Sequence, residues 1–493
     1  MKLKIKNIVL ALSMVLVLSS CKKGWLDVTS DTEIRSDEQF TSESGFKDAL
    51  IGVYLGMTKT SSYSKDMTWN LVDILSRQYS PLISNSQYYD VYNFNYKSIK
   101  ASAQIDAVWN NSYNVIANIN NALDGIEKNK AVLAPISYSI IKGELLGLRA
   151  FIHFDLLRVY GHGNYANRPE LASKFTIPYV SEFSKNITPQ RTYAQTFELL
   201  IKDLTDAQEL LKEDPIFNNP KKASSYYANV NRDGFYNKRE QRMNYYAVKA
   251  LQARVHLWMG GDNNLSKAAL AAEEVIKDAP TQLISSINTV NADPSLYAEH
   301  LFNLNISGFL DVINPFLDAQ NITNSNALFY STQQAEANYE TSNSNIGLAD
   351  FRYNTLLSSQ PRGLVSLKFL QKPASGAPGK NTMPLMRLPE MYYIAAESYS
   401  TVNPSKAVDY LNLVRNKRGI TQNISPSATT VVLKAEIQKE YRKEFLMEGQ
   451  LFFYYKRLGL STFTGLATSI VADDLIYVLP YPNTEIEFGN RVQ

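Results

Sequence analysis

Along most of the chain, apolar residues recur at the three- and four-residue spacing of amphipathic helices, and the clearest helices come in pairs. After Pro389, one apolar stripe runs through Met391, Ile394, Ala395, Ser398 and Tyr399. A second helix is predicted directly after it, because Asn403 can cap its start and Gly419 can end it. The two segments predict a helical hairpin over about 389–418.

An alanine-rich pair of the same kind is predicted earlier in the chain. One stripe runs through Tyr246, Ala250, Ala253 and Leu257, and a second follows over 268–276 after the turn at 260–262. Further helices are predicted over about 104–127, 137–160, 190–212 and 431–458. Recurrent hairpins favour a mainly α fold of tetratricopeptide-like helical hairpins, with an irregular helical bundle as the alternative.

Two stretches interrupt the helical pattern. Residues 61–99 hold eight aromatic residues in 39 positions, against 11% aromatic residues overall, interleaved with Ser, Asn and Gln. Residues 281–384 are rich in Asn, Ser and Thr and predict loops with short strands. We expect both stretches to be long loop insertions, which in compact proteins are commonly functional.

The first 21 residues have the pattern of an export signal. Lys2, Lys4 and Lys6 precede an eleven-residue apolar segment over 8–18, and small residues lead directly to Cys21, the single cysteine. Eleven residues are too few to cross about 30 Å of hydrocarbon as a helix. The pattern predicts a lipoprotein signal peptide over 1–20 and acylation of Cys21, for example by palmitate, with an ordinary signal peptide as the alternative.

Composition and charge narrow the class of ligand. The chain has 493 residues, of which 45% are apolar and 20% charged, as in globular proteins. Its formal charge of +3 lies in the three lysines of the signal segment, so the remaining chain has 50 − 3 = 47 basic residues against 47 acidic ones. A neutral chain has no field that attracts phosphate backbones, so we expect a neutral ligand and no nucleic acid.

The sequence does not contain a recognisable catalytic or metal motif. No two of the four histidines, His153, His162, His256 and His300, have metal-ligand spacing, so neither a metal nor a cofactor is expected. Glu440, Glu444 and Glu448 share one helix face, as a glycoside-hydrolysing pair of carboxylates would require. Bases on the neighbouring hairpin, Arg415 and Arg418, favour structural ion pairs instead. Arg149 and Arg158 are similarly expected to be packed and paired.

The aromatic loops supply the candidate binding residues. A sugar ring has apolar C–H faces and a rim of hydroxyls, so flat aromatic rings with amide and hydroxyl partners can bind a neutral glycan. The candidate residues are Trp69, Asn70, Tyr88, Tyr89 and Tyr92, with Phe329 and Tyr330 from the second loop region. Arg77 is a candidate hydrogen-bond donor to the sugar hydroxyls. The alternative is that these side chains pack beneath the loops or face a protein partner.

Several segments spread over nearly the whole chain form a recognisable series. They are Trp25-Leu26-Asp27 after Cys21; Trp109, Tyr113, Ile116 and Asn120; 143–151 and 157–161; 250–255; 387–392 and 395–397; 411–415; 440–445 with Glu448-Gly449; and 479–482 with Glu485, Ile486 and Asn490. In this order, the segments resemble the SusD/RagB family of outer-membrane nutrient-binding lipoproteins. Tyr441, Lys443 and Gln450 depart from the family's usual residues at positions that we interpret as structural.

The resemblance implies a binding protein that is not an enzyme. Members of the family are lipid-anchored in the outer membrane, face the outside and deliver oligosaccharides, or peptides in the RagB branch, to a SusC-like TonB-dependent transporter. The implied domain spans 21–493, with an N-terminal part over about 21–215, a C-terminal part over about 240–493 and a loop insertion over about 281–384. Peptide is the closest alternative ligand, ahead of a surface glycoside hydrolase and a scaffold that binds only proteins.

Overall fold

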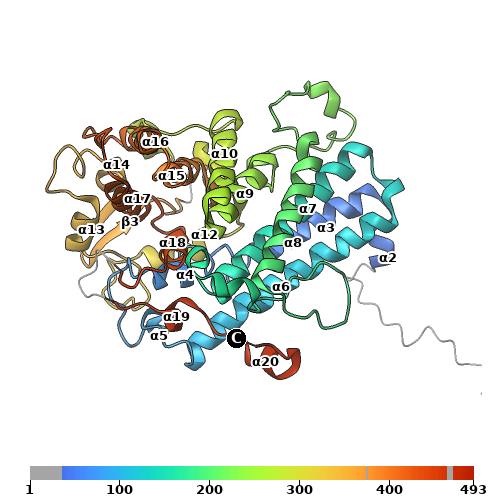
Figure 1. Ribbon diagram of the computed structural model, residues 1–493, viewed down its shortest axis with the longest axis horizontal. Helices are drawn as coiled ribbons and strands as arrows, with labels where there is room; N and C mark the ends of the chain where they lie inside the picture. Colours follow the sequence, from blue (N-terminus) through green and yellow to red (C-terminus); the bar gives the residue numbers. More distant parts are fainter. Residues whose placement is uncertain (1–35, 373–375, 464–469, 493) are drawn as a thin grey trace, which may run out of the picture.

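The computed structural model describes residues 36–372, 376–463 and 470–492, and helices dominate it (Figure 1). The predicted signal segment over 1–20 and Cys21 lie outside the described residues. Within these residues, no helix combines the length and the apolar character needed to cross a membrane.

Helices occur all along the described part of the chain, whereas its strands lie between positions 300 and 387. The helices are α2 (Ser36–Gln39), α3 (Glu43–Met57), α4 (Leu71–Leu75), α5 (Tyr89–Tyr92), α6 (Ile99–Lys128), α7 (Pro135–Tyr160), α8 (Tyr193–Leu210), α9 (Tyr245–Met259), α10 (Asp262–Asp278), α11 (Ile287–Ala292), α12 (Phe309–Ile313), α13 (Thr332–Tyr339), α14 (Phe351–Asn354), α15 (Leu388–Tyr399), α16 (Pro404–Lys417), α17 (Thr430–Glu444), α18 (Gln450–Leu458), α19 (Asp474–Tyr477) and α20 (Asn483–Gly489). The strands are β1 (His300–Asn305), β2 (Leu357–Gln360), β3 (Gly363–Ser366) and β4 (Thr382–Arg387).

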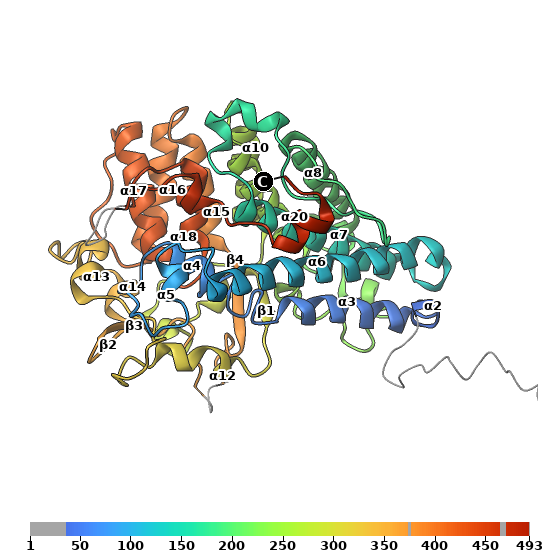
Figure 2. The ribbon, with the colours of Figure 1, turned by 90° about the horizontal axis from the view of Figure 1, so that it is seen from below.

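The long helices pack on one another in chain order. Helix α7 contacts α8, α8 contacts α9, α9 contacts α10, α10 contacts α15, α15 contacts α16, and α16 contacts α17. Helices α3 and α6 pack together and contact α7, which extends the layer at the N-terminal side (Figure 2). The mainly α fold expected from the sequence is confirmed. Each helix contacts the next one in the chain, as in stacked helical hairpins.

The two predicted hairpins form where the sequence places them. The Asn403 side chain accepts a hydrogen bond from the backbone N–H of Lys406, and Pro404 occupies the first turn of α16. Gly419 follows α16 with a φ of +93°, a conformation that favours glycine. In the earlier pair, Asn244 caps α9, and buried alanines of α10, such as Ala268 and Ala272, permit close packing.

The helix predicted over 431–458 is wrong as a single element, because it breaks into α17 and α18. Between them, Met447 and Gly449 have φ values of 64° and 68°, which a continuing helix does not allow. The carboxylate of Asp73, on α4, accepts hydrogen bonds from the backbone N–H groups of Met447 (3.1 Å) and Gly449 (3.3 Å). A residue far away in the sequence therefore fixes this turn.

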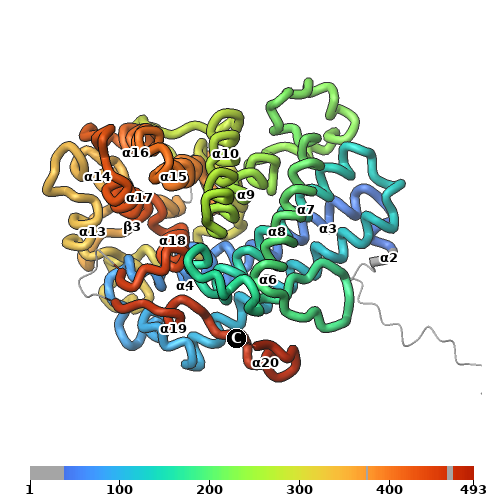
Figure 3. The backbone as a smooth tube through the Cα atoms, viewed as in Figure 1, coloured from blue at the N-terminus to red at the C-terminus, as the bar shows by residue number. Residues whose placement is uncertain are grey.

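Residues 281–384 contain the short strands β1, β2 and β3 and the start of β4, as the sequence predicts, but also the short helices α11 to α14, which it did not predict. Strand β1 pairs antiparallel with β4, with Asn305 opposite Thr382 and His300 opposite Arg387. Strands β2 and β3 form a second antiparallel pair. Figure 3 shows the chain leaving the helical array after α10 and returning beside it at α15. We call the chain between α10 and α15 the excursion. The β1–β4 pair holds its two end portions together.

Candidate functional site

The two aromatic loop segments, residues 61–99 and 309–330, pack against each other and form what we call the loop junction. The backbone N–H of Ser80 donates to the carbonyl oxygen of Phe329 (2.8 Å). Ring contacts join Trp69 to Phe316 (5.0 Å between centroids) and Tyr79 to Tyr330 (5.2 Å). Figure 2 shows α4, α5, β3 and α12 in the same half of the molecule. Segments about 240 residues apart in the sequence therefore build one surface region.

Most of the predicted binding residues lie beneath this surface. Trp69, Asn70, Tyr88, Tyr92 and Tyr330 are all buried. The indole N–H of Trp69 donates to the carbonyl oxygen of Ser64 (2.8 Å), and the Asn70 side-chain oxygen accepts from Gln104 (3.1 Å). In the structure these side chains support the loops, with their rings covered by other residues.

Arg77 is half-buried and engaged within the junction. Its guanidinium carbon lies 3.7 Å from the ring centroid of Tyr92, and Nη1 donates to the Tyr92 carbonyl oxygen (2.5 Å). Burial lowers the pKa of Arg77, although Tyr92 opposes this shift. Arg77 therefore orders the loop that carries Tyr92.

Two of the predicted residues retain accessible ring surface. The side chain of Tyr89 is 38% exposed, and Phe329 is half-buried beneath Arg362, whose guanidinium lies 4.7 Å from the ring centroid. The side-chain oxygen of Asn326 accepts from Ser86 Oγ (2.9 Å) and from the backbone N–H of Gln87 (3.1 Å). These contacts tie the segment that carries Tyr89 to the segment that carries Phe329.

The sequence interpretation missed Arg362 and Asn326. Arg362 donates to the carbonyl oxygen of Asn324 (2.6 Å), which orients its guanidinium over Phe329. The high Asn content of the insertion is the signal that could have identified Asn326 as a loop-ordering residue, because Asn side chains often bond to nearby backbone.

Two buried carboxyl groups lie under the junction. Burial raises the pKa of Asp66 to about 6 and that of Asp73 to about 7, despite the hydrogen bonds that each accepts. Near neutral pH, these groups therefore add less negative charge than exposed carboxylates would. These two carboxyl groups therefore give the junction little negative charge.

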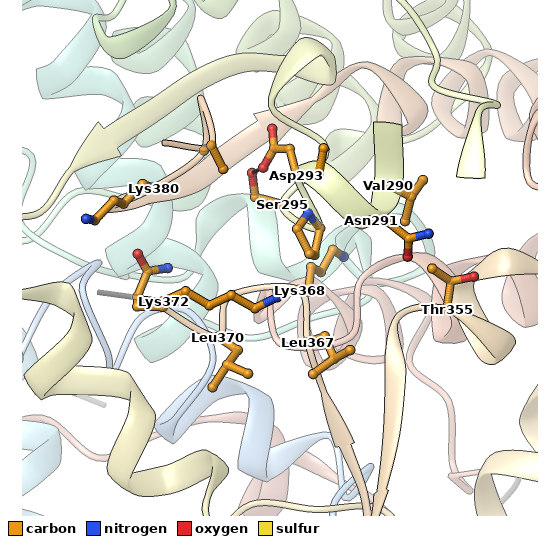
Figure 4. A pocket seen from close by; sticks show the side chains of 15 residues that line it. Val290, Asn291, Asp293, Ser295, Thr355, Leu367, Lys368, Leu370, Lys372 and Lys380 are labelled. Atoms are coloured by element: carbon orange, nitrogen blue, oxygen red, sulfur yellow. Dashed lines mark hydrogen bonds between the residues drawn. The ribbon is translucent and has the colours of Figure 1, made fainter. Parts of the chain in front are cut away.

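Residues 290–295 and residues of the segment 367–380 line a cavity of about 380 Å³, which we call the polar cavity (Figure 4). Asp293, Ser295, Lys368 and Lys372 contribute side chains to its lining, and no described residue of the lining is aromatic. Gln371 also lines it. Its backbone exchanges two hydrogen bonds with the Asn314 side chain (2.8 and 2.9 Å), two residues before Phe316 of the junction.

The three glutamates on one face of α17 and the following turn are buried among arginines, in what we call the ionic network. Glu440 pairs with Arg352 (2.8 Å) and Arg415 (3.1 Å). Glu444 pairs with Arg418 (2.9 Å) and Arg387 (2.8 Å), and Glu448 pairs with Arg387 (2.7 Å) and Lys368. The expected structural ion pairs are confirmed.

The electrostatic surroundings of Glu440 disfavour a general-acid role. Burial alone would raise its pKa, but the cations Arg352, Lys443 and Arg415 together lower it to about 2. A general acid near neutral pH needs the opposite shift and access to substrate. The other expected pairs also form: Arg149 makes a bidentate contact with Asp203 (2.7 Å for both bonds), and Arg158 contacts Asp155. Among the described residues, no three His, Cys, Asp or Glu side chains gather as metal ligands.

Comparison with known proteins covers most of the chain. Residues 24–232 match a SusD-like family described as "Starch-binding associating with outer membrane", and residues 314–486 match the SusD family, SusD/RagB. A search of curated proteins finds no match.

Solved structures share the fold. A SusD superfamily protein from Bacteroides thetaiotaomicron VPI-5482 has a TM-score of 0.72 at 23% identity, covering 92% of this chain and 99% of its own. A SusD-like carbohydrate binding protein from Bacteroides vulgatus ATCC 8482 has a TM-score of 0.70 at 17% identity, covering 91% and 96%. With two family matches in chain order and this shared fold, the chain belongs to the SusD/RagB family.

Proposed function

We propose that the protein is an outer-membrane lipoprotein that binds a neutral oligosaccharide at the loop junction and delivers it to a SusC-like TonB-dependent transporter. The observation that carries this proposal is that Tyr89 is 38% exposed and Phe329 only half-buried, in two segments that Asn326 joins through hydrogen bonds to Ser86 and Gln87. The description of the matched family as starch-binding supports the class of ligand.

The chemistry of the junction fits a sugar better than an ion. The apolar face of a sugar ring can stack on Tyr89 or Phe329, while its hydroxyls bond to Asn326, Gln87 and Arg362. Buried Trp69, Tyr88 and Tyr92 fix the positions of the loops, so that the exposed groups are ordered before the ligand binds.

The proposed location rests on the N-terminus and the family. Acylation of Cys21 would hold the chain on the outer membrane, facing the outside, and the matched family is described as associating with that membrane. Incorporation of labelled palmitate, abolished in Cys21→Ala, would support the anchor. Co-purification with a large barrel would support the transporter partner.

We propose binding without catalysis. The ionic network buries and neutralises the only glutamate series that suggested a hydrolase. If the purified protein released shorter products from an oligosaccharide, and Glu444→Gln abolished that release, a hydrolase would replace the proposed function.

A peptide remains the second candidate ligand, and the polar cavity is the observation that favours it. Its described lining lacks aromatic rings but supplies Asp293, Ser295, Gln371 and three lysines, which suit the backbone and charged ends of a peptide. Peptide capture would depend on these groups, whereas glycan capture would depend on Tyr89 and Phe329.

A binding screen of residues 22–493 against neutral oligosaccharides and peptides tests the choice. For a glycan, Tyr89→Ala and Phe329→Ala should each weaken binding about tenfold, while Lys372→Ala and the exposed control Ile287→Ala should not. Saturable peptide binding that is sensitive to Lys372→Ala and insensitive to Tyr89→Ala would select the second candidate. Binding of proteins alone would select a scaffold.

A further inference from the structure

A second cavity, of about 440 Å³, lies away from the loop junction, between α6, residues 178–188 and α20. We call it the C-terminal groove. Trp109 and Tyr113 of α6 contribute to its floor, and Phe488 of α20 forms part of its wall. Figure 2 shows α20 lying over α6 close to the C-terminus. Its volume falls within the range of about 300–1,000 Å³ that is typical of ligand sites.

Hydrogen bonds fix the walls of the groove on α6. The hydroxyl of Tyr113 donates to the carbonyl oxygen of Pro178 (2.9 Å). The side-chain amide of Asn120 donates to the carbonyl oxygen of Val180 (2.9 Å). These two bonds hold residues 178–180 against the helix.

The opposite wall is tied to the C-terminal segment. Arg491 donates to the carbonyl oxygen of Thr188 (2.6 Å), and Val492 exchanges two hydrogen bonds with the Gln190 side chain (2.8 and 2.9 Å). Two chain segments separated by about 300 residues are thus held in one arrangement. The groove is a built feature of the fold.

The lining combines accessible apolar groups with neutral polar ones. Phe488 is 71% exposed and Ile187 is 63% exposed, while Tyr113 is half-buried. Ser184, Asn186 and Thr484 supply hydroxyl and amide groups at the rim. The charged side chains of the lining, Glu485 and Arg491, pair with each other at 3.0 Å.

We propose that the C-terminal groove is a second saccharide site, in which a neutral sugar ring lies against Phe488 and Tyr113 and its hydroxyls bond to the rim. A bare ring, hydroxyl and amide partners, and no unpaired charge are the complement of a sugar's apolar face and hydroxyl edge. The choice of a saccharide rests on the proposed function, but the site is separate from the loop junction.

Two sites on one chain would have a consequence for long glycans. A polymer that is bound at one site presents its other units to the second site at a high effective concentration. The groove would therefore retain a long chain near the protein while the junction releases and rebinds it. A short ligand that cannot reach both sites would gain nothing.

Isoleucine methyl NMR of residues 22–493 can test both sites separately. The methyl group of Ile187 reports on the groove, and that of exposed Ile322 reports on the loop junction. The probes are neutral di- and tetrasaccharides built from glucose, mannose, xylose and galactose. We expect a saturable shift of the Ile187 signal with a Kd of about 1 mM, because the groove is open to solvent.

Matched variants test whether each methyl signal reports only on its own site. Phe488→Ala should weaken the affinity reported by Ile187 about tenfold and leave that reported by Ile322 unchanged, and Tyr89→Ala should do the reverse. Asn186→Ala, at the rim, is the second groove variant. Leu270→Ala, an exposed leucine on α10, should affect neither signal.

Each outcome separates this inference from the proposed function. If saccharides shift the Ile322 signal but never the Ile187 signal, the second site is rejected and the proposed function stands. A shift of Ile187 alone supports the groove and contradicts glycan binding at the junction. If neither signal moves, both fail. If phospholipid vesicles shift Ile187 and no saccharide does, the groove contacts a lipid surface and the inference is overturned.

Discussion

The loop junction and the C-terminal groove both contain aromatic rings, but they use them differently. In the junction, the buried rings of Trp69 and Tyr88 pack against Phe316 of the second loop segment, and Arg77 lies over the buried ring of Tyr92. In the groove, the ring of Phe488 is largely uncovered. A high density of aromatic residues in a sequence therefore indicates packing as readily as binding, and the covering element decides which of the two occurs.

The two regions also differ in their charges. The junction covers the buried carboxyl groups of Asp66 and Asp73, whose pKa values burial raises to about 6 and about 7. The groove carries a partly exposed ion pair between Glu485 and Arg491. We therefore expect the junction to link stability to pH, and the ion pair of the groove to contribute little to stability.

The largest expected effect is on the buried ring of Trp69. Trp69→Ala would leave a cavity beside Phe316 and an unpaired carbonyl at Ser64, so the free energy of unfolding should fall by about 3–5 kcal/mol. Denaturant unfolding followed by circular dichroism measures this. A loss below about 1 kcal/mol would mean that the ring does not support the junction, and the contrast with the groove would disappear.

The next effect is a pH dependence caused by Asp73. Because its folded pKa is raised above the unfolded value, its contribution favours the folded state below about pH 4 and is lost as the pH rises through about 7. Removing that carboxyl in Asp73→Asn also removes one hydrogen bond to the 447–449 turn. The destabilisation by Asp73→Asn should therefore shrink by about 2 kcal/mol between pH 5 and 8.

The variant must be compared with the parent protein at each pH. Burial lowers the pKa values of His153 and His300 to about 3, so these histidines make stability rise with pH between about 3 and 6.5 and partly mask Asp73. Unfolding curves for both proteins at several pH values cancel the histidine contribution. A difference that does not change with pH would show that Asp73 is ionised throughout.

A smaller effect is expected at the accessible edge of the junction. Tyr89→Ala should change the free energy of unfolding by less than about 1 kcal/mol, because the side chain is partly exposed, yet weaken saccharide binding about tenfold. Calorimetric titration and thermal unfolding of the same sample provide both values. A strong loss of stability without a loss of binding would show that Tyr89 packs the loops, as the buried rings do, and does not bind the ligand.

The smallest effect on stability is expected in the groove. Phe488→Ala should change the free energy of unfolding by no more than about 0.5 kcal/mol, because the ring is mostly exposed. The free energies of unfolding of Phe488→Ala and Trp69→Ala, measured under the same conditions, compare the two regions directly. A loss as large as that for Trp69→Ala would identify Phe488 as a packing residue.

Much of the fold could be predicted from local patterns. The cap at Asn403, the glycine after α16 and the apolar stripes are short-range signals, and each gave a helix boundary close to the observed one. The break between α17 and α18 could not be predicted, because the carboxylate that fixes the turn belongs to Asp73. The apolar pattern continues through the turn without interruption.

The candidate site could be predicted only in part. The residue types followed from composition, but loops have no periodicity that separates exposed from buried rings or that pairs one loop with another. Tyr88 and Tyr89 are neighbours with opposite exposure, and Tyr88 is covered by Phe316, more than 200 residues later. The groove was not predicted either, because its exposed ring lies in a C-terminal segment whose neighbour is residues 187–190.

The β1–β4 pair has a consequence for how relatives of this protein could diversify. Because the two strands clamp the ends of the excursion together, its middle could be replaced by a longer or shorter sequence at a small cost in closure entropy. The exchange would be constrained at Arg352 and Lys368, which lie inside the excursion and complete buried ion pairs outside it. A graft that retained these two cations would keep the host stable while giving it a new recognition surface.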